Sequence, residues 1–262
     1  MKKYIAGIVC LLALTAVFSC RRSEQPEPIP PVPVKLVTKL FVSETDFQSF
    51  GYNGQKQVTS YISQWQSSPE TISRIEYHIG YQDGRLHQQV SQAGRSTYEY
   101  QDGRPVKAAN FTANGRKLST HQFEYDTRGR LQRVTETMEL PDEAEAVRMD
   151  FQYDENGNLR RSDHWLRKTG EETFTLQFSK IYEAYDTQPQ PVPSPVWEHF
   201  LPIPNMHVNN PLRIVNRGPD GELLSRLHLQ YQYGPDGYPI ARTQRVEIDG
   251  VLQAPVVFEY QY

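Results

Sequence analysis

Short runs of alternating apolar and polar residues fill the chain from about Lys35 to its end. Residues i and i+2 of an extended strand lie on one face, so this alternation indicates strands with one buried side. The runs are about 8–12 residues long, as in an antiparallel meander. None has the period of an amphipathic helix. The pattern therefore predicts an all-β domain.

Turn residues separate these runs at regular intervals. Asn-Gly and Asp-Gly pairs adopt the positive φ angles that tight hairpins require. They occur at Asn53-Gly54, Asp83-Gly84, Asp102-Gly103, Asn114-Gly115, Asn156-Gly157, Asp220-Gly221, Asp236-Gly237 and Asp249-Gly250, with weaker signals at Gly94, Gly129 and Gly170. This spacing predicts an antiparallel up-and-down meander of about 12–14 strands.

Two of the hairpin segments are near copies of each other. Phe123–Leu131 (FEYDTRGRL) recurs as Phe151–Leu159 (FQYDENGNL), and looser copies begin at Tyr98, Tyr231 and Phe258. Each copy places two aromatic rings on one strand face and the polar residue between them on the other. We expect the stacked rings of neighbouring copies to form the core.

The number of strands and the two chain ends predict closure. Twisted open sheets rarely exceed about ten strands without curling or splitting. The C-terminal run places Phe258, Tyr260 and Tyr262 on one uncharged face, which would aggregate if it formed an open edge. The run Lys35–Ser43 is strand-like and has no other partner. Pairing the first strand with the last gives a strongly curved sheet or a closed soluble barrel.

Charged side chains argue against a membrane-spanning barrel, in which one face of every strand is apolar. Within residues 130–140, for example, Arg133 and Glu136 lie on opposite faces. We therefore expect a barrel that is not membrane-spanning.

The segment Asp186–Asn210 is the one long stretch without a strand pattern, and we treat it as a Pro-rich insertion. Its six prolines (189, 191, 193, 195, 202 and 204) accompany Trp197, His199, Phe200, Leu201 and Met206. Side chains alone cannot fill a barrel of this many strands, and long loops in compact domains are usually functional or disordered. We predict that the apolar residues of the insertion pack into the barrel mouth as a plug or lid.

Residues 1–20 have the features of a signal peptide. The uncharged run Tyr4–Phe18 is shorter than the roughly 20 residues of a membrane-spanning helix. It leads into Val17-Phe18-Ser19-Cys20, which resembles a bacterial lipobox. The resemblance implies cleavage before Cys20 and membrane anchoring through acylation of Cys20. The alternative is an ordinary secreted protein that is cut near Ser19.

Residues 21–34 form a Pro-rich tether of polyproline II type, and residues 35–262 form a single β domain. Cys10 leaves with the signal, so no disulfide is expected and the core must stabilise the domain. The formal net charge of −3 becomes more negative when the signal is removed. This balance argues against nucleic acid as a partner.

Catalytic and metal-binding patterns do not emerge from the sequence. The HExxH, GxSxG, P-loop and CxxC motifs are absent. His199 and His207 share the insertion, but the histidines have no ligand spacing. Asp154–Asn158 is similar to the start of a calcium loop, yet Trp165 occupies the twelfth position, so a hairpin turn is expected. We predict no catalytic residues, no metal site and no cofactor.

The repeated segments are similar to the YD repeats of Rhs-type bacterial proteins. The whole arrangement of lipobox, proline stalk, hairpins and Asn210-Pro211 resembles Bacteroidota lipoproteins with a porin-like domain of unknown function. The resemblance covers nearly all of the mature chain and implies a fold rather than an activity. Lipoprotein sorting favours the outer membrane, with the periplasmic or surface side left open.

These observations predict a lipid-anchored, non-catalytic cell-envelope barrel that binds or scaffolds. A small apolar or glycan ligand is the expected partner, and Trp65, Trp165, Trp197 and the tyrosines are candidates for stacking on it. The alternatives are an envelope glycan hydrolase and a structural partner of an outer-membrane complex.

Overall fold

The computed structural model describes residues 34–139, 144–192 and 206–262. Cys20, the predicted signal peptide and residues 21–33 of the tether lie outside the described residues, as do residues 193–205 of the predicted insertion. Val34–Tyr262 form one compact unit. No helix within the described residues is long and apolar enough to cross a membrane.

The described residues fold into 17 strands. They are β1 (Lys39–Phe41), β2 (Phe47–Tyr52), β3 (Val58–Ser68), β4 (Thr71–Gln82), β5 (Arg85–Ser91), β6 (Gly94–Gln101), β7 (Arg104–Thr112), β8 (Lys117–Tyr125), β9 (Leu131–Met138), β10 (Ala144–Tyr153), β11 (Leu159–Lys168), β12 (Thr175–Pro189), β13 (Asn209–Arg217), β14 (Leu223–Tyr233), β15 (Pro239–Ile248), β16 (Val251–Leu252) and β17 (Val256–Gln261).

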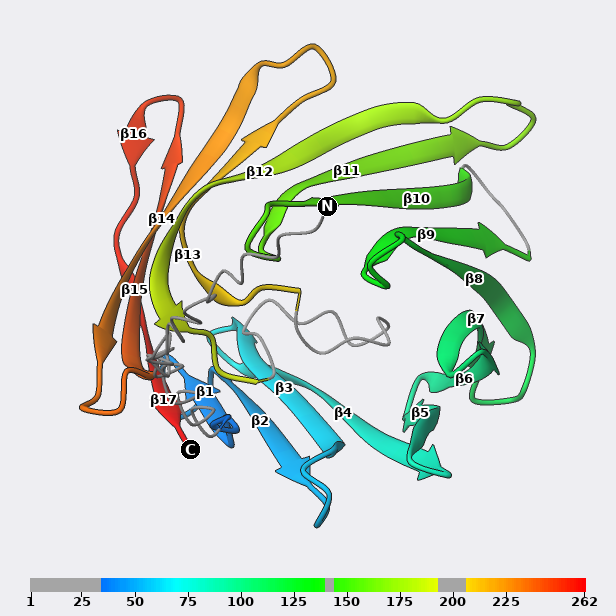
Figure 1. Ribbon diagram of the computed structural model, residues 1–262, viewed down its shortest axis with the longest axis horizontal. Coiled ribbons are helices and arrows are strands. Elements are labelled where there is room, and N and C mark those ends of the chain that lie inside the picture. The colour runs from blue at the N-terminus through cyan, green and yellow to red at the C-terminus, as the bar shows by residue number, and fades with distance from the viewer. Residues whose placement is uncertain (1–33, 140–143, 193–205) are drawn as a thin grey trace, which may run out of the picture. The chain divides into compact units, whose positions relative to one another are not determined.

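The strands form a closed antiparallel barrel (Figure 1) in which each strand from β1 to β14 pairs with the next along the chain and β15 pairs with β17. The circuit closes where β1 pairs with both β2 and β17, so that Leu40 lies opposite Tyr260. The two-residue strand β16 pairs only with β15 and lies outside the circuit. The predicted all-β meander and the predicted pairing of the first strand with the last are confirmed.

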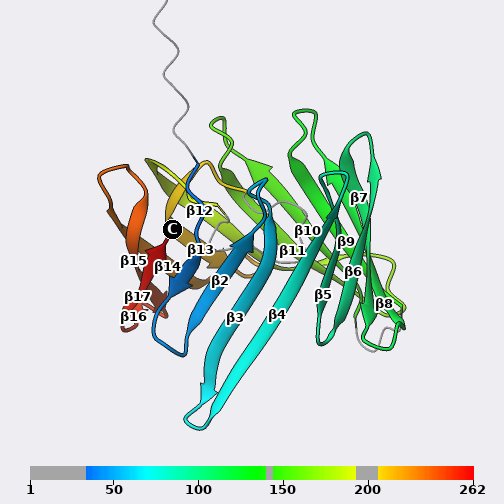
Figure 2. The same cartoon turned by 90° about the horizontal axis from the view of Figure 1, so that it is seen from below.

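Some turns lack the residues on which the sequence count relied. The predicted number was about 12–14 strands, whereas 17 are present in the described residues. The turn between β1 and β2 is stabilised by Asp46. Its carboxylate accepts hydrogen bonds from the Ser43 and Thr45 hydroxyls. The β3–β4 hairpin turns at Pro69 and Glu70 without a glycine. This hairpin extends beyond its neighbours at one end of the barrel (Figure 2).

The paired aromatic residues face the inside of the barrel, as predicted. In three copies the first ring is buried, namely Tyr98, Phe123 and Phe151, and in the last copy the second ring, Tyr260, is buried. Two apolar clusters result, one centred on β6–β11 and one on β1–β4 and β17, and Leu86 packs against both. The core therefore consists of side chains that point into the barrel, and it does not lie between two packed sheets.

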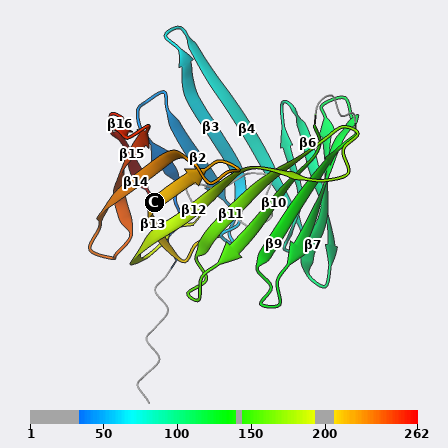
Figure 3. The same ribbon diagram turned by 90° about the horizontal axis from the view of Figure 1, so that it is seen from above.

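The outward faces of the same strands carry charged side chains. Asp150 lies between the inward residues Met149 and Phe151 and pairs with Arg133 and Arg148, at 2.5 and 3.2 Å. An outward pair joins Arg226 to Glu247 at 3.0 Å on β14 and β15. Strands that face lipid need an apolar outer side. The outer side of these strands is charged instead. Figure 3 shows the strands of this wall side by side.

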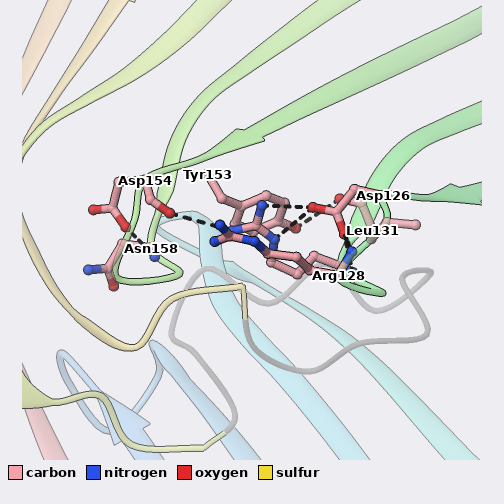
Figure 4. Close-up of polar contacts among 7 residues, drawn as sticks. Asp126, Arg128, Leu131, Tyr153, Asp154 and Asn158 are labelled. Atoms are coloured by element: carbon pink, nitrogen blue, oxygen red, sulfur yellow. Dashed lines mark hydrogen bonds and ion pairs between the residues drawn. The ribbon is translucent and has the colours of Figure 1, made fainter.

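The repeated segment encodes its own turn (Figure 4). The Asp126 carboxylate accepts hydrogen bonds from the backbone N–H groups of Arg128 and Arg130, at 2.9 and 2.8 Å. Gly129 adopts a φ of 81° between them, which is a conformation that side chains disfavour. The Arg130 guanidinium then lies 4.6 Å from the ring centroid of Tyr153 in the next copy. One copy therefore contacts the next through its turn.

A series of tyrosine hydroxyl groups links successive hairpins. In each case the tyrosine sits at or near the end of a strand and donates to a backbone carbonyl near the start of an earlier strand. The donors and acceptors are Tyr52 to Val37, Tyr81 to Val58, Tyr125 to Pro105, Tyr153 to Leu131, Tyr185 to Leu159 and Tyr262 to Pro239. We call this series the tyrosine ladder and the end of the barrel where it lies the tyrosine end.

Removing one hydroxyl from the ladder tests its contribution to stability. Tyr153 donates to the carbonyl of the fully buried Leu131 at 2.9 Å. We expect Tyr153→Phe to lower the free energy of unfolding by about 1–3 kcal/mol, because the carbonyl loses its partner without gaining water. Tyr231→Phe is the matched control, since the buried Tyr231 hydroxyl does not donate to a backbone carbonyl. Equal urea midpoints for the two variants would contradict a structural role for the ladder.

Candidate functional site

The barrel wall separates between β13 and β14 at the tyrosine end. β14 pairs with β13 only from His228 to Leu223, although it continues to Tyr233 alongside β15. A hollow of about 680 Å³ lies there, lined among others by Ala184, Asp186, Leu212, Arg213, Tyr231 and Tyr233. We call this hollow the wall cleft. Backbone pairing stops short at this end between other hairpins as well, for example beyond the Arg133–Asp150 pair of β9 and β10. The wall cleft is the candidate site because Asp186 and Tyr233 meet at this hollow.

Asp186 sits at the edge of the wall cleft and uses the geometry of the repeated turn. As in the repeat, its carboxylate accepts the N–H two residues on, from Gln188 at 3.0 Å. The second N–H comes from Asn210, at 3.1 Å and 24 positions away. Tyr185 pairs with Pro211 just as Tyr125 pairs with Leu131. The insertion therefore lies within one turn of the repeat, between Asp186, which supplies the carboxylate, and Asn210, which supplies the second N–H group.

Tyr233 departs from the tyrosine ladder at the same place. Its hydroxyl donates to the Asp186 carboxylate instead of to a carbonyl of the preceding hairpin. Burial raises the pKa of Tyr233, and the hydrogen bond to Asp186 raises it further. The hydrogen bond between Tyr233 and Asp186 thus joins β14 to β12 at the tyrosine end.

His207 anchors the returning end of the insertion inside the barrel. The Tyr185 hydroxyl donates to the Leu159 carbonyl, so His207 Nδ1, at 2.7 Å, is the donor to that hydroxyl oxygen. The ring of Tyr182 lies 5.0 Å away, and the side chain of His207 is buried. Burial lowers the pKa of His207 from 6.5 to about 4. The imidazole is consequently neutral at neutral pH, with its proton on Nδ1.

Asn158 fixes the same segment from the side of the repeat. Its side-chain carbonyl accepts hydrogen bonds from the backbone N–H groups of Val208 and Asn209, both at 2.8 Å. The turn Asp154–Asn158 has the predicted hairpin form, with a 2.8 Å bond from the Asp154 N–H to the Asn158 carbonyl. Among the described residues, no group of three or more His, Cys, Asp or Glu side chains could hold a metal ion.

The described flanks of the predicted insertion are packed against the barrel. β12 continues as a strand to Pro189, which is further than the sequence pattern indicated. Beyond it, Val192 accepts a hydrogen bond from Val37 and donates one to Lys35, and Met206 packs against the apolar core. The segment that leads into β13 lies within the ring of strands (Figure 1). Trp197, His199, Phe200 and Leu201 lie outside the described residues, so the plug itself stays a prediction.

The two described tryptophans do not join a common site. Trp65 on β3 is 39% exposed, and the ring of Trp165 on β11 lies under the guanidinium of Arg148 at 4.7 Å. The ligand role of the tryptophans and tyrosines stays a prediction; of these residues, Tyr231 and Tyr233 line the wall cleft. The signal for Asp186 was present in the Tyr185-Asp186 pair, which repeats Tyr125-Asp126 and Tyr153-Asp154 without the glycine that follows them.

The pKa of His207 predicts a pH dependence. Below pH 6.5 the unfolded chain protonates this histidine, while the folded chain resists until about pH 4. The unfolded state then binds more protons, so up to about 3 kcal/mol of stability present at pH 7 is lost as the pH falls through this window. We expect His207→Asn to reduce the difference between the unfolding free energies at pH 7 and pH 4.5. The exposed His78→Asn is the control, and an equal reduction in both variants would contradict the assignment.

Comparisons with known proteins support the fold. No model of a known protein family matches the sequence, and no curated protein matches it. A crystal structure of a porin-like protein from Bacteroides uniformis ATCC 8492 is similar, with a TM-score of 0.58 at 14% identity over 87% of this chain and 97% of that one. A porin-like protein from Bacteroides vulgatus ATCC 8482 aligns with a TM-score of 0.42 at 11% identity over 87% of this chain and 98% of that one. The first comparison shows that this chain shares a porin-like β-barrel fold.

Proposed function

We propose that this chain is a lipid-anchored, non-catalytic barrel of the cell envelope that binds a small apolar or glycan ligand. The observation that carries the proposal is the wall cleft, an opening lined by tyrosines in a barrel with inward rings and outward charges. Pockets that bind small molecules are mostly apolar concavities with a few fixed polar groups. The outward ion pairs support a position outside the hydrocarbon of the membrane.

The carboxyl groups favour a binding protein over the alternative of a glycan hydrolase. A hydrolase needs one carboxyl group with a raised pKa to act as a general acid. Where a shift is resolved among the described residues, at Asp46, Asp126, Asp236 and Glu247, the pKa is lowered by hydrogen bonds and ion pairs at turns or on the outer face. These carboxyl groups stay ionised and suit solvent-facing structural roles.

A second candidate function is contact with a partner protein of an outer-membrane complex. Exposed apolar side chains gather on adjacent strands at the barrel end opposite the tyrosine end, namely Leu223, Leu224, Ile248, Val251, Leu252, Val256 and Val257. Exposed apolar patches of this kind often mark interaction surfaces. This surface is separate from the wall cleft, so the two functions are compatible.

Anchoring rests on Cys20 and has a direct test. We expect Cys20→Ser to abolish the acyl mass at the mature N-terminus and to release the protein from the membrane fraction, because several acyl chains are needed for stable anchoring. Mass spectrometry of the N-terminal peptide together with fractionation of a Gram-negative host provides the measurement. Cys10→Ser, inside the predicted signal, is the control and should remain anchored. A wild-type chain that begins unmodified near Ser19 would contradict the proposal.

Ligand binding is tested on protein purified from its own host membranes. Native mass spectrometry is expected to show the barrel with the added mass of one small molecule, which denaturation releases. Tyr233→Phe, which removes the bridge across the wall cleft, is expected to lower the occupied fraction. Only bare protein in every preparation would contradict a binding role, and the added mass of another protein would favour the second candidate.

A further inference from the structure

Arg242 on β15 is an arginine buried inside the barrel. Its exposed fraction is 5%, and it lies directly opposite Tyr231 on β14 and Phe258 on β17. Its guanidinium carbon is 4.2 Å from the ring centroid of Phe258. Tyr260, two positions beyond Phe258, is on the same inward face and is also buried. A cation is thus surrounded by aromatic rings.

This cation lacks a counter-ion within the described residues. None of the ion pairs there includes Arg242, and its Nε has no hydrogen-bonding partner. The hydroxyls of Tyr231 and Tyr260 are buried, and the polar group beside each is Arg242 itself, which can donate to them but cannot accept. Burial raises the pKa of both tyrosines while Arg242 opposes the rise, so both hydroxyls keep their protons. A cation and two hydroxyl protons therefore converge without an anion to accept them.

Asp186, the carboxylate that lines the wall cleft, already has hydrogen-bonding partners. Asp186 accepts hydrogen bonds from Tyr233, Gln188 and Asn210. A buried charge without a partner is strongly unfavourable, and so is a buried donor without an acceptor. Groups of this kind persist at binding sites because a ligand supplies what the fold does not. Tyr231 also lines the wall cleft, which gives the site a route from outside.

We propose that Arg242, Tyr231 and Tyr260 bind the oxyanion of an acidic ligand whose apolar body packs against the surrounding rings. The inference rests on the proposed ligand-binding function and narrows it to carboxylates or phosphates attached to an apolar group. A guanidinium is suited to this because its planar donors match the oxygens of a carboxylate or phosphate.

The test uses a matched set of soluble probes: 2-naphthoate, 2-naphthyl phosphate and the neutral 2-naphthamide. Isothermal titration calorimetry is performed on the mature chain carrying Cys20→Ser, which avoids detergent. We expect at least one acid to bind and the amide to bind more weakly. Arg242→Met should weaken the acid about 10- to 100-fold, which corresponds to the loss of charge-assisted hydrogen bonds, and should leave amide binding unchanged. The ratio of the dissociation constants of 2-naphthoate and 2-naphthyl phosphate then indicates whether the acidic group of the natural ligand is a carboxylate or a phosphate.

Stability separates recognition from a structural role. Without ligand, Arg242→Met should raise the melting temperature, because it removes an uncompensated buried charge. Tyr260→Phe should weaken binding of the acid without lowering the melting temperature, since its buried hydroxyl has no acceptor for its proton. Arg245→Gln, exposed on the same strand, is the control and should change neither quantity.

Two results would overturn the inference. Equal binding of acid and amide, or binding that Arg242→Met leaves intact, would exclude an oxyanion site while leaving the proposed binding function in place. Failure of both acids to bind to the unaltered barrel would also overturn it, and the native mass measurement would then judge the binding function separately.

Discussion

The hydrogen bond from a tyrosine hydroxyl to a backbone carbonyl of an earlier hairpin is the interaction on which this barrel depends. Each ladder tyrosine bonds to a neighbouring strand of the preceding hairpin, at the end where backbone pairing between the two strands has stopped. The ladder therefore joins successive copies where the backbone does not. At Tyr125, Tyr153 and several equivalent positions the register shifts by one residue, and such bulges bend a strand. Repeated around the sheet, the bend closes it.

Within the described residues, the candidate site lies where a tyrosine of this series bonds to a carboxylate instead of a carbonyl. The insertion between Asp186 and Asn210 preserves the hydrogen bonds of the turn. Tyr233 bonds to Asp186, while the neighbouring Arg242 has no counter-ion within the described residues. Tyr231, which lies opposite Arg242, lines the same hollow as Asp186 and Tyr233.

The sequence predicted the parts of the fold that depend on local pattern. The pairing of the first strand with the last followed from the apolar edge that the last strand would otherwise expose. The inward position of Phe123 and Phe151 followed from the two-residue period of a strand. The strand number was underestimated because turns such as Pro69-Glu70 carry no glycine signal. The site was not predictable in the same way, since Asn158 meets Val208 across 50 residues and the isolation of Arg242 is a property of the assembled barrel.

Closure of the barrel is tested most directly by residue-resolved amide hydrogen exchange in β1 and β17. The Thr38 amide donates to the Gln261 carbonyl at 2.8 Å, and β17 is bonded on both sides. The account predicts slow exchange at Thr38 and at consecutive amides of β17, as in a central strand. Rapid exchange at Thr38 with alternating fast and slow amides along β17 would mean an open edge and would contradict a closed barrel.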